Sequence, residues 1–397
     1  MLPRLFIFAV VISVVTAARA SIWFVAPDGR DEESAGTLDR PWKTPGYSAT
    51  RAKAGDTVFV EAGTYANFGI KRSGSKAGGS ITFQSQTPHM AKIRCESPEY
   101  VDCITVEADY IKINGFELEN VRAGNFGSGV FARNHHHIAV QNCLIHGMGG
   151  AGVGFDHCDY LLAEGNVIHD TAMWNPYMTS AISFYMNRAF EGVDDGPGFR
   201  NVIRSNTCYH NYNDRAAIGK ETTDGNGIII DTFHGDASTP AYIYPTLVKG
   251  NVCFDNGGKG IHVFQSDHVT ALSNICYHNN WDPGNTGTWR AELSNVQSNH
   301  NHWINNVGVA LVTKTGAVTD ANKAIMNVHT GDYDISDVDW TENISFNGTT
   351  GDISLFNNGP DTALAVSKGN KLGVDPLFIH PGINPFTCDF HMRKSLW

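Results

Sequence analysis

Short stretches in which apolar and polar residues alternate recur along most of this chain. From about residue 80 onward, the segments 81–83, 104–106 and 111–113 alternate with a period of two, which is the pattern of a strand with one buried face. Residues 48–53 differ from this pattern and predict one or two helical turns. The chain is therefore predicted to be almost entirely β, with a short helix near its start.

A motif that begins with asparagine returns at nearly regular intervals. It occurs together with a cysteine in four segments: 142–146, 206–211, 251–256 and 274–279. Residues 166–170 repeat it without the cysteine. Asn142 and Asn166 are 24 residues apart, and Asn251 and Asn274 are 23 residues apart. A fixed period of this length indicates stacked units that are too small to bury their apolar faces alone.

Two further short strands accompany each motif. One is opened by a small residue, as in 129–132, 152–155, 181–184, 227–230 and 260–263. The other precedes the next asparagine, as in 137–140 and 268–271. Three strands in each unit predict a three-sided parallel coil of roughly ten turns. The repeated asparagine is expected at a bend, where its amide can bond to its neighbours in the stack.

The chain resembles the right-handed parallel β-helix proteins of the pectate-lyase-like superfamily. The resemblance rests on these repeats and on residues 54–58, 63–65 and 375–378. It implies an all-β, single-stranded right-handed parallel β-helix with a short N-terminal helical cap. The superfamily includes polysaccharide lyases, glycoside hydrolases, uronan epimerases, esterases and phage adhesins, so the resemblance leaves the activity open.

The expected organisation is a signal peptide followed by one domain. Residues 1–20 contain a basic residue, an apolar run and a small-residue cleavage site, which together predict a secretory signal. Residues 21–397 are expected to form the β-helix, divided into three parts: an N-terminal cap over 21–80, coils over 81–345, and C-terminal coils with a cap over 346–397. Segments that break the period, such as 171–198 and 281–303, are expected to form side loops that carry function.

The composition makes some classes of binding partner less favourable than others. The formal charge is −11 and only 17% of the residues are charged. A negative surface disfavours nucleic acid and anionic membranes, and no later segment is long and apolar enough for a membrane span. We expect a monomer that is secreted or periplasmic and that acts on an acidic polysaccharide.

The cysteines favour structural roles. Cys95 and Cys103 are close enough in sequence to pair across two strands, and export would permit a disulfide. Cys208, Cys253 and Cys276 occupy the same place in the repeat. We expect them to form a buried column of small apolar side chains rather than disulfides or a metal site.

The densest polar segment spans residues 213–236 and contains the predicted catalytic groups. The candidates are Lys220, Arg215, His234 and Asp231. The resemblance implies that a lysine or arginine could abstract the proton next to a substrate carboxylate, so Lys220 or Arg215 is the expected base. The alternative is a solvated turn whose polar side chains bond their own backbone.

Counting along the aligned strands predicts a sugar-binding face. Two outward columns contain Arg133, Asp156, Tyr185, Asp231 and His262. Arg133, Tyr185 and His262 are therefore expected to bind substrate, together with the loop aromatics Tyr244 and Trp174, whose rings can stack on sugars. The alternatives are an ordinary mixed surface and the packing of loops onto the coil.

Clustered carboxylates could also hold calcium, which the resemblance associates with neutralising the substrate carboxylate. The candidate ligands are Asp224 and Asp231, with Asp194 and Asp195 in the first long insertion.

The leading hypothesis is an exported lyase that cleaves a uronic-acid-containing polysaccharide by β-elimination. A glycoside hydrolase that uses two of Asp224, Asp231 and Asp236 is the second possibility. A non-catalytic glycan-binding or structural surface protein is the third.

Overall fold

The computed structural model describes residues 20–96, 100–120, 124–285, 289–310, 322–331, 335–358 and 368–393. Its strands form three long parallel sheets and one short antiparallel hairpin. The predicted signal peptide lies outside the described residues, apart from its last position. Among the described helices, none is long and apolar enough to cross a membrane.

Sheet 1 contains eleven of the described strands. They are β1 (Ile22–Val25), β2 (Thr57–Val60), β5 (Ile81–Ser85), β8 (Ile111–Asn114), β11 (His136–Gln141), β14 (Asp159–Glu164), β17 (Asn201–Arg204), β20 (Thr246–Lys249), β23 (Val269–Leu272), β26 (Asn301–Ile304) and β29 (Val338–Thr341).

Sheet 2 contains ten of the described strands. They are β4 (Phe68–Ile70), β7 (Ile104–Val106), β10 (Val130–Arg133), β13 (Val153–Asp156), β16 (Ile182–Tyr185), β19 (Ile228–Asp231), β22 (Ile261–Phe264), β25 (Ala291–Val296), β28 (Lys323–Val328) and β31 (Leu355–Asn357).

Sheet 3 again contains eleven of the described strands. They are β3 (Gly63–Ala66), β6 (Ala91–Cys95), β9 (Glu117–Asn120), β12 (Leu144–His146), β15 (Val167–His169), β18 (Thr207–Tyr209), β21 (Val252–Phe254), β24 (Ile275–Tyr277), β27 (Val307–Val309), β30 (Ile344–Phe346) and β32 (Lys371–Leu372).

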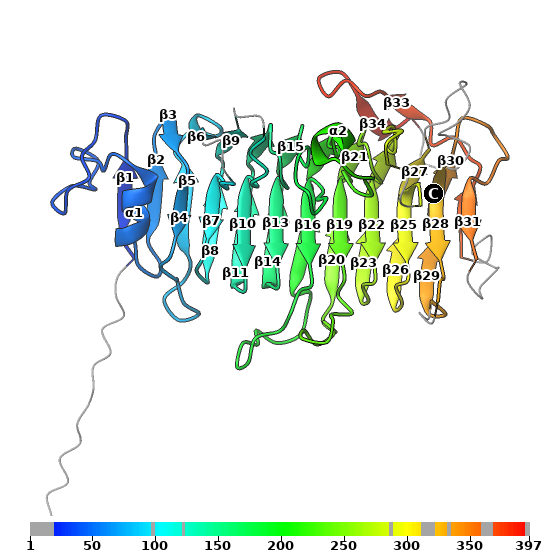
Figure 1. The fold of residues 1–397 in the computed structure, drawn as a ribbon, viewed down its shortest axis with the longest axis horizontal. Coiled ribbons are helices and arrows are strands. Elements are labelled where there is room, and N and C mark those ends of the chain that lie inside the picture. Colours follow the sequence, from blue (N-terminus) through cyan, green and yellow to red (C-terminus); the bar gives the residue numbers. More distant parts are fainter. Residues whose placement is uncertain are drawn as a thin grey trace, which may run out of the picture.

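Each coil contributes one strand to each sheet, so the chain winds through the three sheets and the coils stack along the long axis (Figure 1). This confirms the predicted parallel β-helix with three strands per coil. The parallel pairing begins earlier than the predicted boundary at residue 81, because β2 already pairs in parallel with both β1 and β5.

Helix α1 (Pro45–Arg51) lies at the N-terminal end and packs against β4 and β1. The side chain of Thr44 caps it by accepting a hydrogen bond from the backbone N–H of Tyr47. This helix confirms the predicted N-terminal cap. At the other end, the hairpin of β33 (Phe378–His380) and β34 (Asp389–Met392) lies above the C-terminal half of the coil.

A ladder of buried asparagines runs along the bend before sheet 3. Each side-chain oxygen accepts hydrogen bonds from the backbone N–H and the side-chain amide of the preceding member. Its members are Asn166, Asn206, Asn251, Asn274, Asn306, Asn343 and Asn370. The prediction that the repeated asparagine bonds to its neighbours in the stack is confirmed.

The first member of the sequence motif is one residue out of register with this ladder. Leu144 pairs with Val167, so Cys143 rather than Asn142 occupies the ladder position. The backbone N–H of Cys143 donates to Asn166, whereas the side chain of Asn142 is exposed. The interval of 24 between Asn142 and Asn166 therefore overstates the true repeat by one residue.

Replacing Asn251 with alanine is expected to destabilise the fold by about 3 kcal/mol, because the buried backbone N–H and side-chain amide of Asn206 and the carbonyl of Ile203 each lose a hydrogen-bond partner. Asn142→Gly is the matched control: Asn142 is exposed and has a φ of 51°, which glycine accepts, so stability should change by less than about 0.5 kcal/mol. Urea unfolding followed by circular dichroism measures both. Equal midpoints for the two variants would contradict this role of the ladder.

The structure contains the disulfide that the sequence permits and the expected column of buried cysteines. Cys95 and Cys103 form a disulfide. The predicted column is formed by free, buried thiols that occupy equivalent positions on adjacent strands of sheet 3: Cys208, Cys253 and Cys276.

Candidate functional site

An outward column of side chains follows the ends of the strands in sheet 2. Arg133, Asp156, Tyr185, Asp231 and Phe264 pair with one another in register from coil to coil. This is the alignment that the sequence predicts. The side chain of Arg133 is 61% exposed and Tyr185 is 39% exposed, so this part of the column is open to solvent.

Arg133 is held in place by a chain of contacts. Its Nε and Nη2 atoms donate to Oδ2 of Asp156 at 2.8 and 2.5 Å. Nδ1 of His157 contacts the other oxygen of Asp156, and Nε2 of the same ring lies 3.1 Å from the hydroxyl of Thr239. A guanidinium fixed in this way can offer its remaining N–H groups to an anion or a hydroxyl.

The side chain of His262, which belongs to the second predicted column, is buried. His262 is 4% exposed, and its Nδ1 atom lies 3.0 Å from the hydroxyl of Ser294 in the next coil. Burial lowers the pKa of His262 well below its usual value, and the nearby charge of Lys259 lowers it further. The described conformation therefore offers no surface of His262 to a substrate.

Three ionisable groups interact around strand β19, two of them where the chain enters sheet 2 and one at the far end of the strand. Asp224 lies shortly before β19, Asp231 ends that strand, and Lys259 lies shortly before β22. Lys259 is completely buried, and its Nζ atom donates to the backbone oxygen of Thr223 at 2.9 Å. Asp224 accepts a hydrogen bond from Asn226 at 3.2 Å.

Burial moves the pKa values of these groups toward each other. Desolvation raises the pKa of Asp224, and the opposing charge of Lys259 limits that rise. Burial, with a smaller contribution from Asp224, raises the pKa of Asp231 to about 7. Burial lowers the pKa of Lys259 to about 8, although Asp224 and Asp231 act in the opposite direction. Groups whose pKa values lie near neutrality can exchange protons at working pH.

Lys259 is not among the bases predicted from the sequence, because it lies outside the dense polar segment of residues 213–236. The repeat itself nevertheless pointed to this position. Gly227 and Gly260 open aligned strands, so Lys259 takes the position that Asn226 has one coil earlier. Asn226 is buried, so a lysine at the equivalent position of the next coil is expected to be buried as well, which makes it a better candidate than an exposed one.

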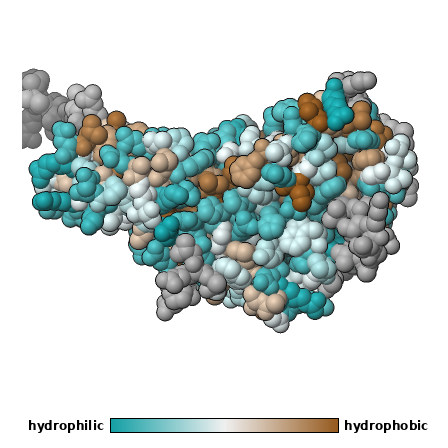
Figure 2. Space-filling view, turned by 90° about the horizontal axis from the view of Figure 1, so that it is seen from above, coloured by the Kyte–Doolittle hydropathy of each residue, from teal (hydrophilic) through white to brown (hydrophobic). Residues whose placement is uncertain are grey.

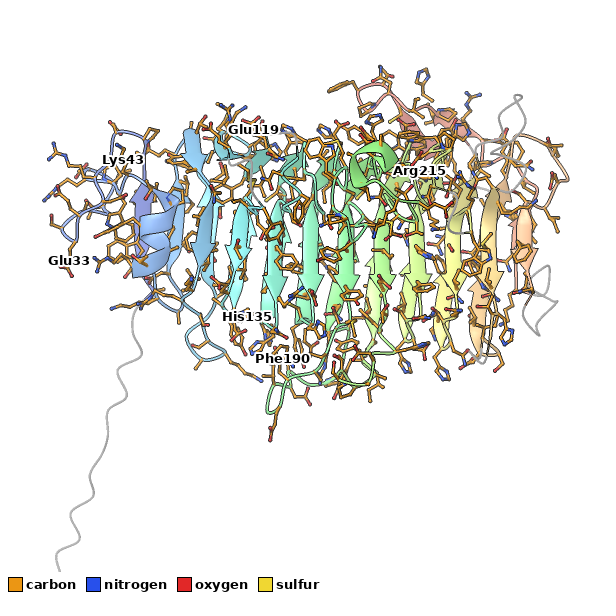
Figure 3. All side chains as sticks on the ribbon, in the orientation of Figure 1. Glu33, Lys43, Glu119, His135, Phe190 and Arg215 are labelled. Carbon is orange, nitrogen blue, oxygen red and sulfur yellow. A yellow bond between two sulfur atoms is a disulfide. The ribbon has the colours of Figure 1, made fainter. Side chains whose placement is uncertain are left out.

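The predicted catalytic residues are not brought together as a group. Arg215 belongs to α2 (Arg215–Ile218) at the upper edge of the coil, and it lies 3.9 Å from Glu221 (Figure 3). Lys220 is exposed on the same loop. His234 lies beyond the other end of β19, where its Nε2 atom is 2.8 Å from Asp267. Of this set, Asp231 is the member whose pKa is influenced by Asp224 and Lys259, and it is partly exposed.

Asp194 and Asp195 lie at the opposite edge of sheet 2 from Asp224. Asp195 contacts Lys76 at 2.8 Å and His137 at 2.9 Å. Asp194 lies 3.2 Å from the hydroxyl of Tyr160. These contacts tie the first long insertion to the corner of sheet 1, near the position of His135 and Phe190 in Figure 3. The structure does not bring this pair together with Asp224 and Asp231.

The two loop aromatics also differ in their surroundings. The guanidinium of Arg200 lies 3.3 Å from the ring centre of Tyr244, so this ring packs one insertion against another. Arg200 in turn pairs with the buried carboxylate of Asp159 at 3.0 Å. Trp174 is half-buried in the loop between β15 and β16, and its backbone N–H donates to Gly149.

Among the described residues, one group has three potential metal ligands within reach of one another: Glu117, Glu119 and His146 on sheet 3. Both carboxylates are already paired, with Lys92 at 2.9 Å and with Arg94 at 2.6 Å. These cations satisfy the charge that would attract a metal.

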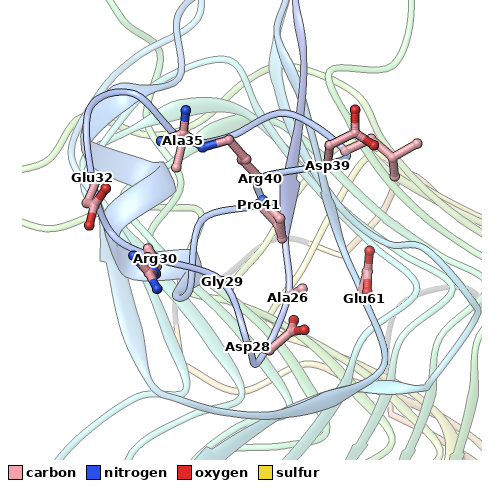
Figure 4. Close-up of a pocket in the computed structure, with 11 residues that line it drawn as sticks. Ala26, Asp28, Gly29, Arg30, Glu32, Ala35, Asp39, Arg40, Pro41 and Glu61 are labelled. Atoms are coloured by element: carbon pink, nitrogen blue, oxygen red, sulfur yellow. The ribbon is translucent and has the colours of Figure 1, made fainter.

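A cavity of about 410 Å³ lies at the N-terminal end of the coil (Figure 4). Its charged lining residues include Asp28, Asp39, Arg40 and Glu61, which belong mostly to exposed loops. It is formed by the first coil and lies apart from the column on sheet 2.

Comparison with known proteins gives the family. A family model described as Pel9A-like, right-handed β-helix region matches residues 23–299, and the chain belongs to this family. Its coil is therefore right-handed, as predicted. No curated protein sequence matches the chain significantly.

Several solved structures are similar to it. Pectate lyase Pel9A has 14% identity and a TM-score of 0.46, and the match covers 83% of this chain and 80% of that one. XylC in complex with xylose has 12% identity and a TM-score of 0.47, with 90% and 87% covered. The A-module of the mannuronan C-5 epimerase AlgE4 from Azotobacter vinelandii has 12% identity and a TM-score of 0.42, with 79% and 91% covered.

Proposed function

We propose that this Pel9A-like β-helix protein is a lyase that cleaves a uronic-acid-containing polysaccharide by β-elimination. The observation that carries the proposal is Lys259, a buried lysine of lowered pKa beside Asp224 and Asp231. Elimination requires a base that is neutral near working pH, and burial is the usual means of producing a neutral lysine.

In the proposed reaction, Lys259 Nζ takes the proton from the carbon next to the substrate carboxylate. The electron pair left on that carbon forms a double bond as the neighbouring carbon–oxygen bond breaks, and the released oxygen takes up a proton. Lys259 is fully buried in this structure. The proposal therefore requires that substrate binding uncovers Nζ.

Arg133 is proposed to bind the carboxylate of a neighbouring sugar unit, and Tyr185 to contact the chain between Arg133 and Asp231. Arg133, Asp156, Tyr185 and Asp231 stand on four successive coils. Because coils repeat about every 4.8 Å, an extended glycan can follow the column from one coil to the next.

The calcium hypothesis rests on Asp224 and Asp231. Their pKa values are raised by burial, and for Asp231 also by the neighbouring carboxylate, which is the situation that a bound cation relieves. We propose these two carboxylates as ligands of a calcium ion, which would neutralise the substrate carboxylate when bound. Asp194 and Asp195 have other partners and are not included.

A glycoside hydrolase is the second candidate, because the same two carboxylates have raised pKa values and a hydrolase needs a protonated acid. Asp236 does not fit this role. It is exposed, and hydrogen bonds from Ser238 and Thr239 lower its pKa.

The test is an activity assay on acidic polysaccharides such as pectate and alginate, with and without a chelator. A lyase produces an unsaturated sugar that absorbs ultraviolet light, and a hydrolase produces only a new reducing end. Reducing ends without ultraviolet absorbance would replace the lyase with the hydrolase. Binding without either product would favour a glycan-binding protein. We keep the expectation of a monomer that acts outside the cytoplasm.

Arg133→Met is expected to raise KM by about tenfold on an acidic polysaccharide and to leave kcat nearly unchanged, because it removes a charged hydrogen bond away from the reacting atoms. Lys249→Met is the control, since that lysine lies at the end of β20 on sheet 1. If KM stays at the wild-type value in Arg133→Met, the column is not the substrate path.

A further inference from the structure

A second cavity lies beneath the C-terminal hairpin, on a different sheet from the column described above. It has a volume of about 420 Å³ and opens between the outer face of sheet 3 and residues 375–393. We call it the strap pocket. Tyr277, Val309 and Phe346 line it from sheet 3, whereas Asp375, Phe378 and Arg393 line it from the hairpin side.

The walls of the strap pocket are fixed by a small hydrophobic cluster of their own. Phe378 and Phe390 of the hairpin pack with Phe254, Val309 and Ile344 of sheet 3, apart from the main core. Seen from above, apolar side chains gather over this end of the molecule (Figure 2). The hairpin is therefore a packed part of the fold.

Two side chains of opposite charge, Asp375 and Arg393, line the pocket. Asp375 accepts a hydrogen bond from the backbone N–H of Leu377 at 2.8 Å. Arg393 donates from Nη2 to the backbone oxygen of Ile379 at 3.0 Å. Each contact uses only part of the side chain, so the carboxylate can accept, and the guanidinium can donate, further hydrogen bonds. The two charges have opposite signs, so together they add no net charge to the pocket and offer both hydrogen-bond acceptors and donors.

The remaining wall of the strap pocket is formed by aromatic side chains without charge. Burial lowers the pKa of His278 to about 4, and its ring stacks on Tyr277 with the centroids 3.8 Å apart. Phe346 and Phe378 add further apolar surface.

We propose that the strap pocket binds one sugar residue of a glycan, as a secondary site separate from the column on sheet 2. A cavity of this size with apolar walls and few polar groups is typical of small-ligand sites. A pyranose presents apolar C–H faces to the rings and hydroxyl groups that can both donate to Asp375 and accept from Arg393. The aromatic walls and the two opposite charges together match a ligand that has both apolar faces and hydroxyl groups. The proposal does not depend on the elimination chemistry.

The test uses methyl-labelled full-length protein that carries Lys259→Met, so that no probe is cleaved. Xylotriose and trigalacturonate are the neutral and acidic probes. Binding in the strap pocket should shift the methyl NMR signals of Val309 and Leu377, which line it, and leave those of Leu247 on sheet 1 unchanged.

Arg393→Gln and Phe346→Ala should each weaken this binding by at least about tenfold, since each removes a principal contact. Phe386→Ala is the control because that side chain is 93% exposed and does not line the pocket. The proposal is overturned if neither probe shifts the two methyl signals, or if Arg393→Gln binds as tightly as the control while its thermal melt is unchanged. Ultraviolet product formation by Arg393→Gln with Lys259 intact tests the lyase activity separately.

Discussion

Lys259→Met is expected to lower turnover by at least about a hundredfold, the low end for the loss of a general base. Methionine has a similar length and fills the same space, but the substitution leaves the Thr223 carbonyl without its hydrogen-bond donor and the buried Asp224 without the nearby positive charge. Some loss of thermal stability is therefore expected, and a melting curve gives a temperature at which the variant is fully folded for the assay. Initial rates of ultraviolet absorbance on the best acidic polysaccharide measure the effect.

Lys220→Ala is the matched control for this experiment. Lys220 is the base that the sequence alone suggested, and it lies exposed on the loop that leads to Asp224. We expect it to keep at least half of the wild-type turnover. The assignment of Lys259 is wrong if Lys259→Met remains active while Lys220→Ala or His234→Ala is inactive. If all three variants remain active, the reaction takes place elsewhere on the coil.

The rate is expected to rise with pH between about 6 and 9 and to level off above that range. Lys259 accepts a proton only in its neutral form, which becomes the main form above its pKa of about 8. Asp231 is ionised above its pKa of about 7. The neutral lysine and the ionised aspartate both become more populated as the pH increases. Activity is therefore expected to fall when the pH is lowered. A profile of kcat/KM against pH reports these values for the free enzyme.

Asp224→Asn should move the midpoint of this profile to lower pH. The Asp224 charge is the largest factor that opposes the lowering of the Lys259 pKa, so its removal favours the neutral lysine. The midpoint is read independently of the maximal rate, which also changes if calcium binding is lost. Asp236→Asn removes an exposed carboxylate and should leave the midpoint unchanged. An unshifted midpoint in Asp224→Asn would show that a different group controls the rate.

The fold could be predicted from the sequence because its determinants are local and repeated. Each coil contains the same short apolar strands and the same buried asparagine, and a period of about 23 residues permits few other structures. The alignment of Arg133, Asp156, Tyr185 and Asp231 also follows from the repeat, since in-register stacking places equivalent positions in columns. Even the error at Asn142 shows this rule, because the strand pairing rather than the asparagine itself sets the register.

The site could be predicted only in part, because its properties depend on burial and on the paths of the loops. Lys220 and Lys259 are the same residue type, and only the tertiary structure shows that one is exposed and the other is buried beside two carboxylates. Asp194 and Asp224 likewise differ in their partners, since the insertion that contains Asp194 folds toward sheet 1. The sequence by itself determined the coil, its period and its columns. The tertiary structure decided which charges lost their water, because desolvation depends on what the loops and the next coil place around each group.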